Sequence, residues 1–199
     1  MILTDRLHIR PFQPTDGARV ARLYQDNPHH LGDWLPLDNR LLLSDDFWQL
    51  AAPELAKRQD NGKEMRFFIT WAHDLNGPIL GYLSLTRIDH QNRSCEISFG
   101  IGQRFTRQGI ASEAVRGAMK YASDTLGIDR IDANHAVQNV ASCELLSRLG
   151  YTRIGVAPAF RWVNGEWADY VLRTWISKDR REDRELPLPP ELAAFLNSR

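Results

Sequence analysis

The chain has 199 residues, of which 43% are hydrophobic and 25% are charged, enough for one well-packed domain and short for two. Its 25 basic and 25 acidic side chains give zero formal net charge, so no global field attracts nucleic acid or an anionic membrane, and we expect neither as a partner. No apolar run approaches the roughly 20 residues that span a bilayer, and residues 1–12 do not resemble a signal peptide. Cys95 and Cys143 lack zinc or disulfide spacing, so we expect a reducing cytoplasm and no bound metal.

The first part of the chain predicts one strand and two helices. Arg6–Phe12 places apolar residues on one side and ends near a proline, which favours a strand. Helical spacing predicts a helix over residues 16–27 and another over Asp46–Asp60, in which Pro53 is expected to start or split the helix. The hydrophobic segment 29–40 lacks periodicity and predicts either a substrate-side loop or a short buried turn.

Three strands are expected next, in an antiparallel arrangement. Arg66–His73 and Ile79–Ile88 are strand-like, and Asn76–Gly77 between them is typical of a hairpin turn with positive φ. Ser94–Ile101 alternates apolar and polar residues and extends the meander by another strand.

The second half of the chain predicts a helix, a strand, a helix and a hairpin, over Gln108–Leu126, Arg130–Ala136, Asn139–Leu149 and Arg153–Ile176. Gly127 and Gly150 are expected to end the two helices, and Asn164–Gly165 is expected to form the hairpin turn. The order of elements predicts an α+β fold with a mainly antiparallel, twisted sheet of about seven strands, one parallel crossover and four helices.

The segment Gly102–Ser112, GQRFTRQGIAS, leads from a predicted strand into a predicted helix. The first N–H groups of a helix have no partner within it and bind anions such as phosphate. Gly109 permits a close backbone approach, and Arg104 and Arg107 add positive charge. An ordinary surface loop remains an alternative, whereas the P-loop and Rossmann glycine patterns are absent.

A second segment, NVASCELLSRLGY, opens the helix after the strand Arg130–Ala136. Asn139 is suited to cap this helix, and Ser142 lies one turn further on. Both side chains are candidates to face a ligand, but capping by Asn139 and back-bonding of Ser142 to the helix would explain them equally well.

Together, TRQGIA and NVASCELLSRLGY resemble the paired motifs of the GNAT superfamily of acetyltransferases. The segments TDRLHIRPF, SCEISFGIGQRFTRQGIASEA and VNGEWADYVL are similar to the RimJ/RimL branch, most closely RimJ, over about residues 4–177. The resemblance implies one GNAT domain over residues 1–199, with a core of about 4–177 and a C-terminal extension over 178–199. It also implies a V-shaped splay between the fourth and fifth strands. Two positions depart from the family, because Thr106 replaces a usual Gln or Arg and Leu146 replaces a frequent catalytic Tyr.

The resemblance implies acetyl-CoA as cosubstrate, no metal, and direct transfer to an amine in a ternary complex. Ser142 would donate a proton to the departing thiolate, and Glu96 would act as general base, through a water if needed. An ion pair of Glu96 with Arg93 or Arg104 is an equal alternative. The residues expected to bind the cofactor are Phe99, Gly100, Ile101, Arg104, Arg107, Gln108, Gly109, Ile110, Ala111, Ser112, Asn139 and Ser142.

The branch that this sequence resembles acetylates N-terminal α-amines of ribosomal proteins, so a protein N-terminus is the expected acceptor. An α-amine with a pKa of ~8 loses its proton at pH 7 for ~1.4 kcal/mol, against ~4.6 kcal/mol for a lysine, so a weak base suffices. Arg161 stands near the place of a glutamate base assigned in the RimL-like branch, so that base cannot be transferred. The alternatives are a small-amine acetyltransferase and a non-catalytic CoA-binding module, and a homodimer is one candidate assembly.

Overall fold

The computed structural model describes residues 1–31, 39–163 and 165–178. Residues 32–38 of the expected loop, position 164 of the expected turn, and all of the expected extension except Lys178 lie outside the described residues. Among the helices that are described, none is both long and apolar enough to cross a membrane.

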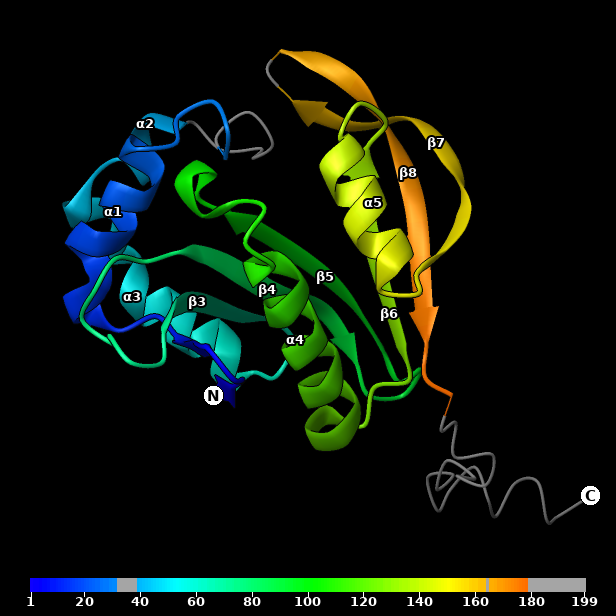
Figure 1. The fold of residues 1–199 in the computed structure, drawn as a ribbon, viewed down its shortest axis with the longest axis horizontal. Coiled ribbons are helices and arrows are strands. Elements are labelled where there is room, and N and C mark those ends of the chain that lie inside the picture. Colours follow the sequence, from blue (N-terminus) through cyan, green and yellow to red (C-terminus); the bar gives the residue numbers. More distant parts are fainter. Residues whose placement is uncertain (32–38, 164, 179–199) are drawn as a thin grey trace, which may run out of the picture.

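The core of the fold is one mixed sheet with the strand order β1-β2-β3-β4-β5-β6-β8-β7 (Figure 1). The strands are β1 Ile2–Leu3, β2 Leu7–Pro11, β3 Met65–Trp71, β4 Gly81–Asp89, β5 Ser94–Ile101, β6 Arg130–Ala136, β7 Thr152–Val163 and β8 Glu166–Ile176. Every neighbouring pair is antiparallel except β5 and β6. The described part of the sheet has eight strands, one more than expected, because β1 adds a two-residue edge strand.

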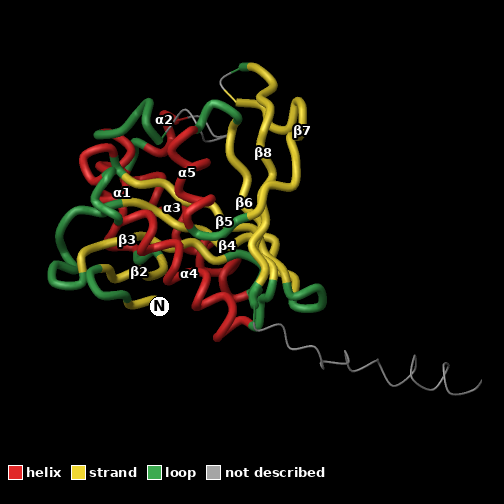
Figure 2. The backbone as a smooth tube through the Cα atoms, turned by 45° about the vertical axis from the view of Figure 1, so that its right-hand side comes forward, coloured by secondary structure: helices red, strands yellow, loops and turns green. Residues whose placement is uncertain are grey.

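The parallel pair β5–β6 is joined only at its start. Three residue pairs connect the strands, from Ser94 opposite Arg130 to Glu96 opposite Asp132. Beyond them β5 continues to pair with β4 as far as Ile101, and β6 continues to pair with β8. Figure 2 shows β6, β8 and β7 diverging from the strands β2 to β5. The expected V-shaped splay is thus confirmed.

The four predicted helices are all present as α1 Gly17–Gln25, α3 Asp45–Asp60, α4 Ile110–Leu126 and α5 Val140–Arg148. A further single turn, α2 Asn39–Leu42, begins at the end of the segment 29–40, which was expected to be a loop or a short buried turn. The structure also has two short 3-10 helices, η1 Pro14–Asp16 and η3 Gln103–Phe105.

The prediction that Pro53 starts or splits a helix is wrong. The helix α3 begins at a Ser44 cap, whose hydroxyl accepts from Phe47 N, and runs through the proline. Pro53 and Gln49, whose carbonyl loses its helical donor, are both exposed, so water can satisfy that carbonyl.

Each face of the sheet is covered by different helices. Alternation along β3 points Phe67 toward the apolar side of α4, while Phe68 points toward α1 and α3. On the face covered by α1 and α3, Trp48 is 1% exposed, and its ring centroid lies 5.7 Å from that of Tyr24 and 5.8 Å from that of Phe68. The helix α5 joins the α4 side through buried leucines such as Leu145 (Figure 1).

The turns follow the glycine predictions in part. Gly127, Gly150 and Gly165 have φ values of +68°, +85° and +84°, the left-handed conformation that glycine adopts most readily. The prediction of positive φ at Gly77 is wrong, because the β3–β4 hairpin is closed by a longer connection in which Gly77 N donates to Asp74 O.

Candidate active site

The loop before α4 presents a row of free backbone donors. Gly109 caps the helix with φ +79°, and Arg107, two residues earlier, also has a positive φ of 61°. Within the described residues no group accepts from the N–H of any residue over 107–112, and the first bond of α4 is Glu113 N to Gly109 O. Six unpaired donors at the positive end of a 17-residue helix make this loop a candidate anion site.

This loop is fastened to the N-terminal segment of the chain. The Arg6 side chain donates to Gln108 O at 3.1 Å and, through Nε, to Glu113 Oε2 at 2.7 Å. Thr4 Oγ1 donates to Glu113 Oε1 at 2.6 Å. Burial alone would raise the pKa of Glu113, but the hydrogen bonds from Thr4 and Arg6 hold it below its usual value. Glu113 is therefore ionised, and the Arg6 guanidinium balances its charge.

Arg6 is a site residue that sequence reasoning missed. A Cβ at Gly109 would lie 3.3 Å from Arg6 Nη2, so this guanidinium borders the free N–H groups. The sequence pattern assigns Arg6 only to a strand, and its partners, Gln108 in the loop and Glu113 in α4, lie more than 100 residues away in the chain. The resemblance of TDRLHIRPF to the family was the one available signal.

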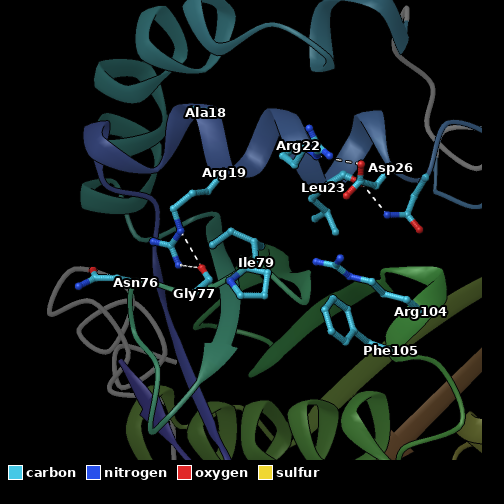
Figure 3. Close-up of a pocket in the computed structure, with 12 residues that line it drawn as sticks. Ala18, Arg19, Arg22, Leu23, Asp26, Asn76, Gly77, Ile79, Arg104 and Phe105 are labelled. Atoms are coloured by element: carbon cyan, nitrogen blue, oxygen red, sulfur yellow. Dashed lines mark hydrogen bonds and ion pairs between the residues drawn. The ribbon is translucent and has the colours of Figure 1, made fainter.

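Three side chains of this loop, those of Arg104, Thr106 and Gln108, make contacts within the protein. Thr106 Oγ1 donates to Gln103 O at 2.8 Å and Gln108 Nε2 to Arg104 O at 2.9 Å, so both close the loop on itself. The Arg104 guanidinium lies 4.7 Å from the Phe105 ring centroid and points into a pocket of about 500 Å³ beside α1 (Figure 3). Backbone donors, more than these side chains, therefore make up the anion site.

The splay exposes part of the β5 backbone. Gly102 N donates to Leu80 O, so by strand alternation Phe99 and Ile101 direct their N–H and C=O away from β4 and toward the gap. His30 Nε2 lies 3.0 Å from Ile101 O and occupies that carbonyl. Gly100 directs its polar groups at β4 instead.

Gly100 is required by packing. A Cβ there would lie 2.6 Å from Tyr82 Cε1 and 2.9 Å from Leu31 Cδ2, on the sheet face away from α4.

The start of α5 brings Asn139 and Ser142 together. Asn139 Oδ1 accepts from Ser142 N at 3.0 Å, so the expected cap is confirmed. Neither the Asn139 amide nitrogen nor the Ser142 hydroxyl bonds to another described residue, and both side chains are half-buried. Each keeps a free donor next to the gap, while Leu146 is 1% exposed and belongs to the core.

Glu96 lies at the vertex of the splay, with its side chain 12% exposed. Arg161 Nη2 donates to Glu96 Oε1 at 2.8 Å, and Arg87 Nη1 lies 3.8 Å from Oε2. The alternative considered for Glu96, an ion pair with Arg93 or Arg104, is right in that Glu96 is ion-paired but wrong in its partners, and Arg93 pairs with Asp129 instead. The guanidinium competes with any substrate proton for Oε1.

His135 is held in a neutral state. Its Nδ1 lies 2.9 Å from Ala136 O, and its Nε2 accepts from Arg173 Nε at 3.2 Å. Burial lowers the pKa of His135, and the charge of Arg173 lowers it further. Both ring nitrogens are occupied, so this histidine has no free lone pair for a substrate proton.

The structure combines a row of unpaired N–H groups at a helix start with a sheet that opens between two parallel strands. These are the two features that the resemblance to the GNAT acetyltransferases leads us to expect. The chain matches the model of the acetyltransferase (GNAT) domain over residues 6–152, and it belongs to this family. It is an acetyl-transferring enzyme of that family, which disfavours the non-catalytic alternative.

Two relatives within the family match most of the length of this chain. It is 28% identical over 179 residues to the ribosomal protein uS5-alanine N-acetyltransferase of Escherichia coli, covering 89% of this chain and 91% of the relative. It is 27% identical over 179 residues to the putative ribosomal N-acetyltransferase YdaF of Bacillus subtilis, covering 89% and 94%.

Two solved structures share the fold. The ribosomal-protein-S5-alanine acetyltransferase from Vibrio fischeri superimposes with a TM-score of 0.81 at 21% identity, covering 89% of this chain and 96% of that one. RimJ of Mycobacterium smegmatis, solved with a CoA disulfide, gives a TM-score of 0.80 at 22% identity, covering 97% and 90%.

Proposed function

We propose that this enzyme transfers the acetyl group of acetyl-CoA to the N-terminal α-amine of a protein, most simply a ribosomal protein, by direct attack in a ternary complex. The observation that carries the proposal is the row of six free N–H groups at residues 107–112 beside the open strand β5. The names of the E. coli and B. subtilis relatives support the acceptor.

The cofactor roles follow from the free donors. The N–H groups of residues 107–112 bind the pyrophosphate, with Arg6 adding positive charge at Gly109. The backbone groups of Phe99 and Ile101 that face the gap bind the pantetheine arm and the acetyl carbonyl. Asn139 holds a pantetheine amide through its free nitrogen.

Chemistry requires one proton to leave the amine and one to reach the sulfur. The amine nitrogen attacks the thioester carbon, the C–S bond breaks, and the Ser142 hydroxyl passes its proton to the departing thiolate while it takes one from a water, so that the serine hydroxyl is restored. Glu96 accepts the amine proton through a water, since Arg161 holds one of its oxygens. The modest cost of deprotonating an α-amine, about 1.4 kcal/mol at pH 7, makes such an indirect base sufficient.

The test measures CoA release from acetyl-CoA with alanine-starting peptides and with small amines as acceptors. Ser142→Ala is expected to lower kcat by about 10²-fold or more without weakening acetyl-CoA binding, because a positioned acid contributes that much. Ser147→Ala is the matched control, since this exposed hydroxyl on the same helix bonds only to Cys143 O. Equal loss in both variants would contradict the role of Ser142, and turnover on small amines alone would contradict the peptide acceptor.

A further inference from the structure

The register of the sheet gathers polar residues on the face opposite α4. On β5 this face carries Glu96, Ser98 and Gly100, since Cys95 and Ile97 point into the core with α4. Their partners on β4 are Thr86, Ser84 and Tyr82, and Arg66 of β3 lies opposite Ser84. Paired residues of neighbouring strands share a face, so this surface adjoins the splay from the side away from α4 and α5.

Two arginines stand on this face, one on each side of the gap. Arg161 bonds to Glu96, and its guanidinium carbon lies 5.5 Å from the Tyr170 ring centroid. Arg66 comes from the other side of the gap. Tyr82 lies opposite Phe68, so Arg66, two residues before Phe68 on the same face, is its diagonal neighbour across β3 and β4. Burial raises the pKa of Tyr82, and the charges of both Arg66 and Arg161 oppose that rise.

The guanidinium of Arg66 is incompletely satisfied. Its Nε is buried and has no hydrogen-bond partner, although buried guanidinium donors are normally bonded. Its nearest carboxylate is that of Glu64, 3.9 Å from Nη2, and Glu64 also lies 3.5 Å from Arg58. Arg66 therefore has a donor free for a further acceptor.

The charge of this face is positive. Among the described residues, the cations on this face or paired with it are Arg66, Arg87, Arg130 and Arg161, and the carboxylates are Glu96, Glu64 and Asp132; Glu64 is shared with Arg58, and Asp132 pairs with Arg130. The neighbouring tyrosines add no charge. A polyamine would meet like charge here, whereas an anionic group would meet compatible donors.

We infer that the acceptor carries a carboxylate close to its reacting amine, and that Arg161 and Arg66 bind it. This inference rests on the proposed function and specifies its substrate. A guanidinium binds a carboxylate through two parallel hydrogen bonds, which fits the planar forks of Arg161 and Arg66, whose side chains are 37% and 33% exposed. A carboxylate taken up by Arg161 also releases Glu96 Oε1, the oxygen needed to accept the amine proton. The carboxylate belongs to an acidic side chain near a protein N-terminus or to the α-carboxylate of an amino acid.

The experiment compares kcat/KM for peptides that differ only at their second residue, Ala-Asp, Ala-Ala and Ala-Lys, together with free alanine and alaninamide. We expect the Ala-Asp peptide to exceed the Ala-Lys peptide by at least tenfold. Arg161→Gln and Arg66→Gln are expected to bring this ratio close to one, while Arg161→Lys, which keeps the charge, retains part of the preference. Arg153→Gln, an exposed change of the same charge on β7, is the control and leaves the ratio unchanged.

The outcomes separate the inference from the proposed function. Turnover of all three peptides at equal kcat/KM, or the same ratio in the Arg161 and Arg153 variants, overturns the carboxylate site alone. Faster turnover of alanine than of alaninamide and every peptide supports the carboxylate but overturns the peptide acceptor. Acetyl-CoA binding without transfer to any of these acceptors counts against the proposed function, and with it against the site.

Discussion

Replacement of Gly109 by alanine tests the anion site most directly. Gly109 has φ +79°, where a residue with a Cβ costs about 1–2 kcal/mol more than glycine. The added methyl group would also lie 3.3 Å from Arg6 Nη2, so the end of this flexible side chain would have to shift by a few tenths of an ångström. If the loop relieves the strain by leaving this conformation, binding must restore it, and the same 1–2 kcal/mol weakens CoA binding by about 5- to 30-fold.

Gly127→Ala is the matched control at the other end of the same helix. Gly127 has φ +68° at the C-cap, so its replacement carries a similar backbone cost. The stiffer unfolded chain returns about 0.4–1 kcal/mol in each variant. We expect Gly127→Ala to lose about 1 kcal/mol of unfolding free energy, and Gly109→Ala to lose less, because strain that the free loop relieves lowers the CoA affinity instead of the stability. The cap is remote from the free N–H groups, so Gly127→Ala keeps its CoA affinity.

Calorimetric titration with CoA and equilibrium unfolding in urea measure the two quantities separately. We expect a raised CoA Kd only for Gly109→Ala, with an unfolding free energy at least as high as that of Gly127→Ala. A Gly109→Ala enzyme with wild-type CoA affinity would refute the assignment of the pyrophosphate to the backbone of this loop.

Two further variants test the other half of the site and the buried histidine. Asn139→Ser keeps a side-chain oxygen for the helix cap, so the unfolding free energy should change by less than about 0.5 kcal/mol. Acetyl-CoA binding should weaken, because the amide nitrogen is lost. If urea unfolding shows a loss of stability and titration shows no loss of acetyl-CoA affinity, Asn139 has only a capping role. His135 has a lowered pKa in the folded protein, so between that value and about 6.5 the unfolded chain binds more protons and stability falls with falling pH. Its contribution is complete above pH ~6.5, and His135→Gln, which retains an acceptor for Arg173, should reduce the loss between pH 7 and pH 5 in urea unfolding. An unchanged slope would show that other groups, such as His8 with its own lowered pKa, carry the dependence.

The sequence predicted the elements well because their signals are local. The alternation in Ser94–Ile101 and the helical spacing after Gly109 each lie within a short window, and both elements appear where expected. Pro53 was misjudged because its effect depends on whether the freed carbonyl reaches water, which only the packing of α3 decides. The longer β3–β4 connection similarly depends on contacts outside the turn.

The site was predictable only as far as it is made of backbone. The free N–H groups before α4 follow from a glycine at a helix start, and the splay followed from the family resemblance. The partners of Glu96 and the direction of Arg104 did not follow, because long flexible side chains choose among partners brought together by distant strands. Arg161 reaches Glu96 across 65 residues of sequence, and the pairing rests on the β7–β8 hairpin.

The splay has a mechanical consequence for the whole molecule. Among the described residues, the strand pairing that joins β1–β5 to β6–β8 consists of three residue pairs. They run from Ser94 with Arg130 to Glu96 with Asp132. A sheet resists shear through its ladder of hydrogen bonds, and here that ladder stops less than halfway along β5. Rotation of the two halves about this short seam changes the width of the gap without breaking any other strand pair. The salt bridge from Glu96 to Arg161 adds a side-chain connection between β5 and the far half at this seam.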